Sequence, residues 1–133
     1  MKGLVMPIAV VTNSTSDRLP LKTLPEAYVV VRRMNYGEKL LRSNMATKLL
    51  MSGSRDKNDK DVQAEVDMQT ELVAYWDFAN LITEHNLQDA DGRELNFRNP
   101  SDVKKLDSVI GEEVGQLIDN FNSPEESDEV KNF

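Results

Sequence analysis

The sequence predicts a mainly α protein of the α+β class: a small helical domain with a minor two-stranded antiparallel ribbon and a disordered acidic C-terminal tail. Apolar residues recur at helical spacing in several segments, whereas two short segments have the composition or the alternation of strands. The 133 residues suffice for one compact domain, and the absence of cysteine excludes disulfides and zinc-cysteine sites. We therefore expect one domain that needs no covalent or metal cross-link.

Composition divides the chain into three parts. Residues 1–27 contain three prolines and a Thr/Asn/Ser cluster, so we expect an extended N-terminal arm with one strand at residues 8–12. Residues 28–122 contain the recurring apolar patterns and form the predicted helical domain. Residues 123–133 are acidic and poor in apolar residues, which predicts a disordered tail.

Two segments of the domain have strand character. Residues 28–33 are aromatic and β-branched and follow a proline-containing stretch. In residues 62–69, apolar and polar side chains alternate with period 2, as in a half-buried strand. We expect these two strands to pair as an antiparallel ribbon.

Four helices are predicted. The first covers residues 36–51, with Asn35 as N-cap and Glu38 completing a capping box. The second is apolar around most of its circumference, so it is the predicted core helix with Trp76 buried. A short helix follows an Asn-Pro N-terminal signal, and the last helix has a narrow apolar stripe and an aspartate or serine cap. The second, third and fourth predicted helices cover residues 71–86, 100–106 and 108–121.

Charge is distributed unevenly along the chain. Residues 61–133 carry 5 basic and 18 acidic side chains, so this half would repel phosphates and no nucleic-acid partner is predicted. The basic side chains of residues 32–60 are read as a solvated helix face. No apolar run is long enough to span a bilayer and no secretory signal is visible, so no membrane association is predicted.

The sequence contains only weak indications of a metal site or a catalytic site. The Asp-Ala-Asp-Gly sequence at residues 89–92 is interpreted as a turn, because an EF-hand register would place Leu87 and Arg98 at ligand positions 1 and 12. His85 is the single histidine, and we expect it to cap a helix C-terminus rather than to act in catalysis. The sequence predicts no catalytic residue, no cofactor and no metal.

The partner-binding surface is expected on the first and last helices. Their apolar stripes are narrow enough to be partly exposed in a monomer. The predicted partner-binding residues are Leu41, Met45 and Leu49 on the first helix and Val114, Leu117 and Phe121 on the last.

Four segments together resemble a known family. They are residues 31–38, 78–87, 91–97 and 106–119, and in order and spacing they resemble the tail assembly chaperones of phages with long non-contractile tails. The resemblance extends over residues 28–122. Leu81 and Ser108 stand where the family often has cysteine and proline.

The resemblance implies a non-enzymatic chaperone in the host cell cytoplasm. It would bind and solubilise the tape measure protein, help to recruit the tail tube protein, and represent the short form of a pair whose longer form arises by frameshifting. Residues 130–132 are compatible with a slippery codon heptamer. Self-association remains open, and a structural virion protein, such as a head-tail connector or a tail tube component, is the alternative.

Overall fold

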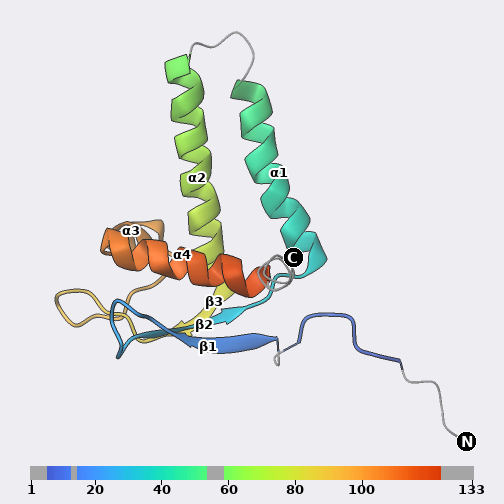
Figure 1. The fold of residues 1–133 in the computed structure, drawn as a ribbon. Coiled ribbons are helices and arrows are strands. Elements are labelled where there is room, and N and C mark those ends of the chain that lie inside the picture. The colour runs from blue at the N-terminus through green and yellow to red at the C-terminus, as the bar shows by residue number, and fades with distance from the viewer. Residues whose placement is uncertain (1–5, 13–14, 54–58, 124–133) are drawn as a thin grey trace, which may run out of the picture.

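The computed structural model describes residues 6–12, 15–53 and 59–123 and contains four helices and three strands in this part of the chain (Figure 1). The side chains of residues 46–69 are outside the description. The elements in chain order are β1 (Ser16–Pro20), β2 (Tyr28–Arg32), α1 (Tyr36–Gly53), α2 (Asp59–Leu81), β3 (Ile82–His85), α3 (Pro100–Lys104) and α4 (Ser108–Asn122).

The strands form one antiparallel sheet in the order β1-β2-β3. Helix α4 crosses one face of the sheet, and α1 and α2 stand side by side as an antiparallel hairpin that projects from this base (Figure 1). The arm before β1 leads away from the body at the opposite side from α3. The molecule thus has a base, made of the sheet, α4, the C-terminal end of α2 and the loops that join them, and a helical hairpin that projects from it.

The predicted fold class is wrong in its strands, because the molecule is a mixed α+β protein with a three-stranded sheet rather than a minor two-stranded ribbon. Residues 62–69, predicted as a strand, lie inside α2. Their alternation is real, but Gln63, Ala64, Glu65 and Met68 are strong helix formers, and the segment runs directly into the predicted core helix. Local helix propensity therefore prevails over the period-2 pattern.

The two strands that pair with β2 lie in segments for which the sequence predicts a different structure. β1 lies in the predicted arm, where residues 8–12, the expected strand, form no strand. β3 occupies the last part of the predicted helix 71–86, beginning at the β-branched pair Ile82 and Thr83. The prediction for residues 28–33 is confirmed by β2, to which both flanking strands pair.

The predicted local signals are confirmed at the other helices. The Asn35 side chain accepts from the Glu38 N–H at 2.8 Å and the Glu38 carboxylate accepts from the Asn35 N–H at 3.0 Å, which is a reciprocal capping box. Asn99 caps α3, and Asp107 caps α4 by accepting from the N–H of Val109. The turn at residues 89–92 is present, with Gly92 at a φ of +83°.

Among the residues whose side chains are described, the apolar core lies in the base. Its largest fully buried side chains come from β2, α4, the end of α2 and the loop after β1. They are Leu21, Val29, Val31, Leu81, Val114 and Ile118. Trp76, predicted to be buried, is only partly buried and packs against the edge of this core.

The predicted acidic tail and the frameshift interpretation fall on residues 123–133. Ser123 follows α4 directly, and the rest of this segment lies outside the described residues.

Candidate partner-binding surface

Helix α1 presents an apolar surface to solvent near its N-terminus. Tyr36, Leu40 and Leu41 are 76%, 48% and 52% exposed. Positions 36 and 40 lie one turn apart on one face of the helix, and Leu41 is adjacent. Gly37 lies between them on the helix surface and adds no side chain. We call Tyr36, Leu40 and Leu41 the α1 patch.

The structure separates the predicted partner-binding residues of α1. Leu41 belongs to the exposed patch, Met45 is half-buried, and the side chain of Leu49 is outside the description. The residues predicted from the sequence did not include Tyr36 or Leu40. Their spacing of four residues was the signal that could have identified them.

The predicted residues of α4 lie mostly against the core. Val114 is fully buried, which corrects its assignment to an accessible stripe, and Leu117 and Phe121 are partly buried and pack on the core. Because α4 crosses the sheet, its apolar stripe faces inward and leaves little surface for a partner. The α1 patch is therefore the better candidate.

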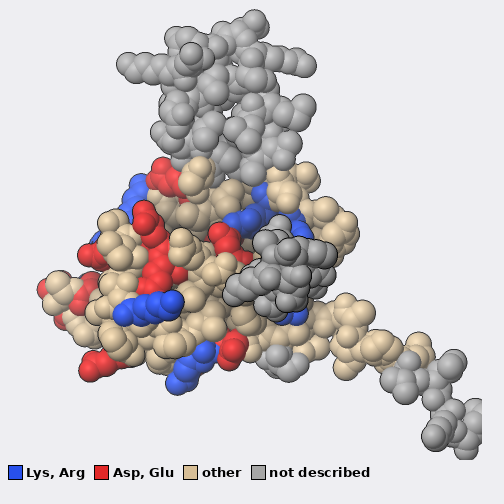
Figure 2. Space-filling view, in the orientation of Figure 1, with Lys and Arg blue, Asp and Glu red and all other residues tan. Residues whose placement is uncertain are grey.

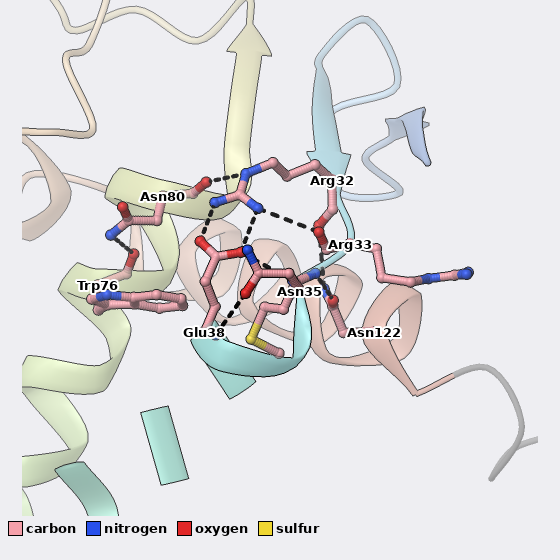
Figure 3. Close-up of polar contacts among 8 residues, drawn as sticks. Arg32, Arg33, Asn35, Glu38, Trp76, Asn80 and Asn122 are labelled. Carbon is pink, nitrogen blue, oxygen red and sulfur yellow. Dashed lines mark hydrogen bonds and ion pairs between the residues drawn. The ribbon is translucent and has the colours of Figure 1, made fainter. Parts of the chain in front are cut away.

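The first turn of α1 is fixed to the end of β2 by an ion pair (Figure 3). The Arg32 guanidinium donates to both oxygens of Glu38, at 2.8 and 2.6 Å, and to the backbone oxygen of Asn80 at 2.7 Å. The hydrogen bonds from Arg32 hold the pKa of Glu38 below its usual range, although partial burial opposes this. One carboxylate thus serves both the capping box and the link between β2, α1 and α2.

A second polar cluster joins α1 to α2 and α4. Arg42 donates to both oxygens of Asp77 at 2.7 Å and reaches Asp119 at 3.3 Å. Asp77 is only 6% exposed, so Arg42 supplies polar partners that solvent could not fully supply there. Partial desolvation raises the pKa of Asp119, although its side chain is 65% exposed, and the Arg42 charge offsets this only in part.

The end of α4 is attached to the segment before α1. Asn122 accepts the Met34 N–H at 2.7 Å and donates to the backbone oxygens of Arg32 and Ile118, as Figure 3 shows in part. The Arg33 guanidinium lies 5.6 Å from the centre of the Phe121 ring. The base therefore holds the N-terminus of α1, and with it the α1 patch, in a defined position.

A groove of about 690 Å³ runs along β3. Residues 78–80 at the end of α2, all four residues of β3, residues 94–98 and Arg32 line it, and we call it the β3 groove. It mixes apolar side chains with two arginines and two glutamates. Two other hollows in the described ranges are smaller, with volumes of about 470 and 430 Å³.

His85 lies in this groove and does not cap a helix. Its Nδ1 accepts the N–H of Leu87 at 3.0 Å, and its ring packs on Phe97 with the ring centres 4.3 Å apart. The prediction of a helix C-cap was wrong because residues 82–85 pair with β2 instead of continuing α2. The imidazole thus holds the backbone at Leu87 and the Phe97 ring in position.

Within the described ranges, no group of three or more His, Asp or Glu side chains is placed to hold a metal ion. In the same part of the chain no helix is both long and apolar enough to cross a membrane. On the face shown in Figure 2, basic and acidic side chains are interspersed over the base. That face presents no continuous basic surface.

Comparisons with family models, with curated protein sequences and with solved structures found no match to this chain.

Proposed function

We propose that this protein is a non-enzymatic assembly chaperone, acting in the host cell cytoplasm, that binds and solubilises the tape measure protein of a long-tailed phage and helps to recruit tail tube subunits. The observation that carries the proposal is the α1 patch, an exposed apolar surface on a projecting helix. The resemblance over residues 28–122 supplies the identity of the partner.

The α1 patch suits an amphipathic partner helix. Tyr36 and Leu40 lie on one face, and a partner helix recognised in this way contributes apolar side chains at spacings of three and four residues. A tyrosine with a large exposed area can act as an anchor that loses little conformational entropy on binding. Two ion pairs, Arg32–Glu38 and Arg42–Asp77, hold α1 in place. The α1 patch is therefore positioned for binding without the partner.

Co-expression with the cognate tape measure protein tests the proposal. The double variant Leu40→Glu, Leu41→Glu is expected to reduce the soluble fraction of the tape measure protein at least tenfold, because two charges would enter the apolar contact. Leu72→Glu is the matched control, since Leu72 is 43% exposed on α2, next to Glu71, which pairs with Lys104 of α3. This control is expected to retain solubilisation.

Circular dichroism of the variants separates loss of binding from loss of folding. If the double variant is folded and still solubilises the tape measure protein, the α1 patch is not the binding surface. Recovery of the protein in purified particles at a fixed copy number would favour the structural virion alternative and overturn the chaperone proposal.

A further inference from the structure

The chain continues beyond α4 with an acidic segment. Residues 124–133, which we call the acidic tail, contain four carboxylates between positions 125 and 129, one lysine, and the apolar residues Val130 and Phe133. The described part of the chain extends to Ser123, directly after α4, and this residue fixes the place from which the acidic tail starts.

The acidic tail starts next to the first turn of α1. Asn122 accepts the Met34 N–H at 2.7 Å and donates to the Arg32 backbone oxygen at 3.4 Å, so the last turn of α4 is bonded to the segment that precedes α1 (Figure 3). Tyr36 of the α1 patch follows Met34 by only two residues, which span at most about 7.6 Å. Ser123 therefore lies close to the edge of the α1 patch.

Two basic side chains flank the α1 patch without a carboxylate partner. Lys39 is exposed and lies one turn from Tyr36 and beside Leu40 on the helix surface. Arg33 is also exposed, and its guanidinium lies 5.6 Å from the centre of the Phe121 ring, at the end of α4 where the acidic tail starts. Within the described residues, neither Lys39 nor Arg33 forms an ion pair.

The other charges around the first turns of α1 are already paired. Arg32 pairs with Glu38, and Arg42 pairs with both Asp77 and Asp119. The two unpaired cations therefore give the α1 patch a positive rim, which favours an anionic occupant with apolar side chains.

The acidic tail matches this rim in charge and in reach. Its carboxylates come first in the sequence, close to Arg33, and its two apolar residues follow. Six extended residues span up to about 20 Å, whereas the first two turns of α1 rise by about 11 Å, so the carboxylates can reach Lys39. Because the tail is covalently attached, its concentration at the α1 patch is on the order of millimolar, and a weak contact is sufficient.

We propose that the acidic tail covers the α1 patch of its own molecule, with its carboxylates near Arg33 and Lys39 and with Val130 and Phe133 against the apolar side chains of the patch. A partner must then displace the tail before it can bind. The contact is a property of the protein alone, and only its consequence for a partner rests on the chaperone function proposed above.

A nitroxide spin label on the tail tests the contact in the full chain. The chain contains no cysteine, so Ser127→Cys provides a single site for the label. A nitroxide broadens the NMR signals of nearby nuclei, and we expect the methyl signals of Leu40 and Leu41 to lose at least half of their intensity. At about 1 M salt the Debye length is only about 3 Å, so most of this intensity should return.

A neutral tail of the same length is the matched control for reach. Its attachment and its spin label are unchanged, so only the attraction differs. We expect the broadening at Leu40 and Leu41 to fall at least threefold. The neutral tail combines Glu125→Gln, Glu126→Gln, Asp128→Asn and Glu129→Gln.

Charge removal from the α1 rim tests the acceptor. Arg33→Gln combined with Lys39→Gln should reduce the broadening as much as the neutral tail does. Arg93→Gln combined with Arg98→Gln is the matched control, because it removes the same charge from two exposed positions outside α1. This control should keep the native broadening, and the same NMR spectra show that each variant is folded.

Titration against the tape measure protein measures the consequence for a partner. A tail that covers the α1 patch lowers the apparent affinity in proportion to the fraction of molecules with an open patch. We therefore expect the neutral tail to solubilise the tape measure protein at a concentration about three to ten times lower than the native chain requires.

Three outcomes overturn the inference. Equal broadening at Leu40 and Leu41 with the native and the neutral tail would show that the carboxylates do not hold the tail on the patch. Equal losses in the two double variants would exclude Arg33 and Lys39 as the acceptor. Broadening that arises only between molecules, in a mixture of isotope-labelled and spin-labelled copies, would identify a second copy as the source of the tail.

These outcomes are separate from failure of the chaperone proposal. The three NMR measurements use the protein alone, so a negative result leaves that proposal untouched. A tail contact at the α1 patch without any gain in solubilisation by the neutral tail would instead count against the patch as the site for the tape measure protein.

Discussion

The base and the helical hairpin are stabilised by different interactions. All of the buried apolar side chains identified in the described ranges lie in the base, whereas none of the described side chains of α1 is buried. Helix α1 is held instead by its capping box and by the ion pairs of Arg32 and Arg42. The comparison shows that one small domain can combine an apolar core with a helix whose described first half, residues 36–45, is attached by directional polar contacts.

The largest effect is expected from the core of the base. Phe78 is 4% exposed and packs edge-to-face on Phe97, with the ring centres 5.2 Å apart. Phe78→Ala should lower the free energy of unfolding by about 3–5 kcal/mol through lost burial and a cavity. Urea denaturation measures this, with the 57% exposed Val109→Ala as control. A loss for Phe78→Ala below that of the partly buried Trp76→Ala would contradict the location of the core.

The ion pair between α1 and α2 should have an intermediate effect. Arg42→Met leaves the buried Asp77 carboxylate without its guanidinium partner, so we expect a loss of about 1–3 kcal/mol. Arg18→Met removes an ion pair with Glu84 whose side chains are 63% and 55% exposed, and should cost under about 1 kcal/mol. Thermal unfolding compares the two, and equal losses would show that burial of Asp77 does not matter.

The same polar contacts predict how stability depends on pH. Glu38 has a lowered pKa in the folded state, so its contribution is complete above the unfolded pKa of about 4.3 and is lost as the pH falls through the folded value. Asp119 has a raised pKa, so its ionisation opposes folding at neutral pH and this penalty disappears on acidification.

Urea titrations at pH 7 and pH 3.5 test these opposite signs. Glu38→Gln should reduce the loss of stability between the two pH values, while Asp119→Asn should increase stability at pH 7 only slightly, because solvent screens the 65% exposed Asp119 side chain. A Glu38→Gln variant with the native pH dependence would show that the pair with Arg32 does not form in solution.

The smallest effect is expected at the helix cap. Asn35→Ala removes the acceptor for the Glu38 N–H and should cost about 0.5–2 kcal/mol. Asn44→Ala, at an exposed position within α1, should be neutral or slightly stabilising, because alanine has the higher helix propensity. Circular dichroism during thermal unfolding measures both, and a reversed order would argue against the capping box.

The α1 patch shows how much of a binding surface can be predicted from the sequence. The period of α1 identified Leu41 and the helix that carries it, because amphipathic spacing is a local property. The same reasoning selected Val114, which the structure places in the core, since it could not show that α4 crosses the sheet. A stripe on a helix becomes a core or a binding surface according to what lies opposite it.

The features that depend on near neighbours could be predicted from the sequence: the caps at Asn35 and Asn99, a cap of α4 at Asp107 or Ser108, of which the structure shows Asp107, and the turn around Gly92. Each rests on hydrogen bonds or backbone preferences within a few residues. The tertiary structure was needed to show that Ser16–Pro20 and Ile82–His85 are strands. A strand gains its hydrogen bonds from a distant segment, here β2, whereas a helix satisfies its backbone internally, so a short segment without an available partner strand becomes helical or remains unpaired.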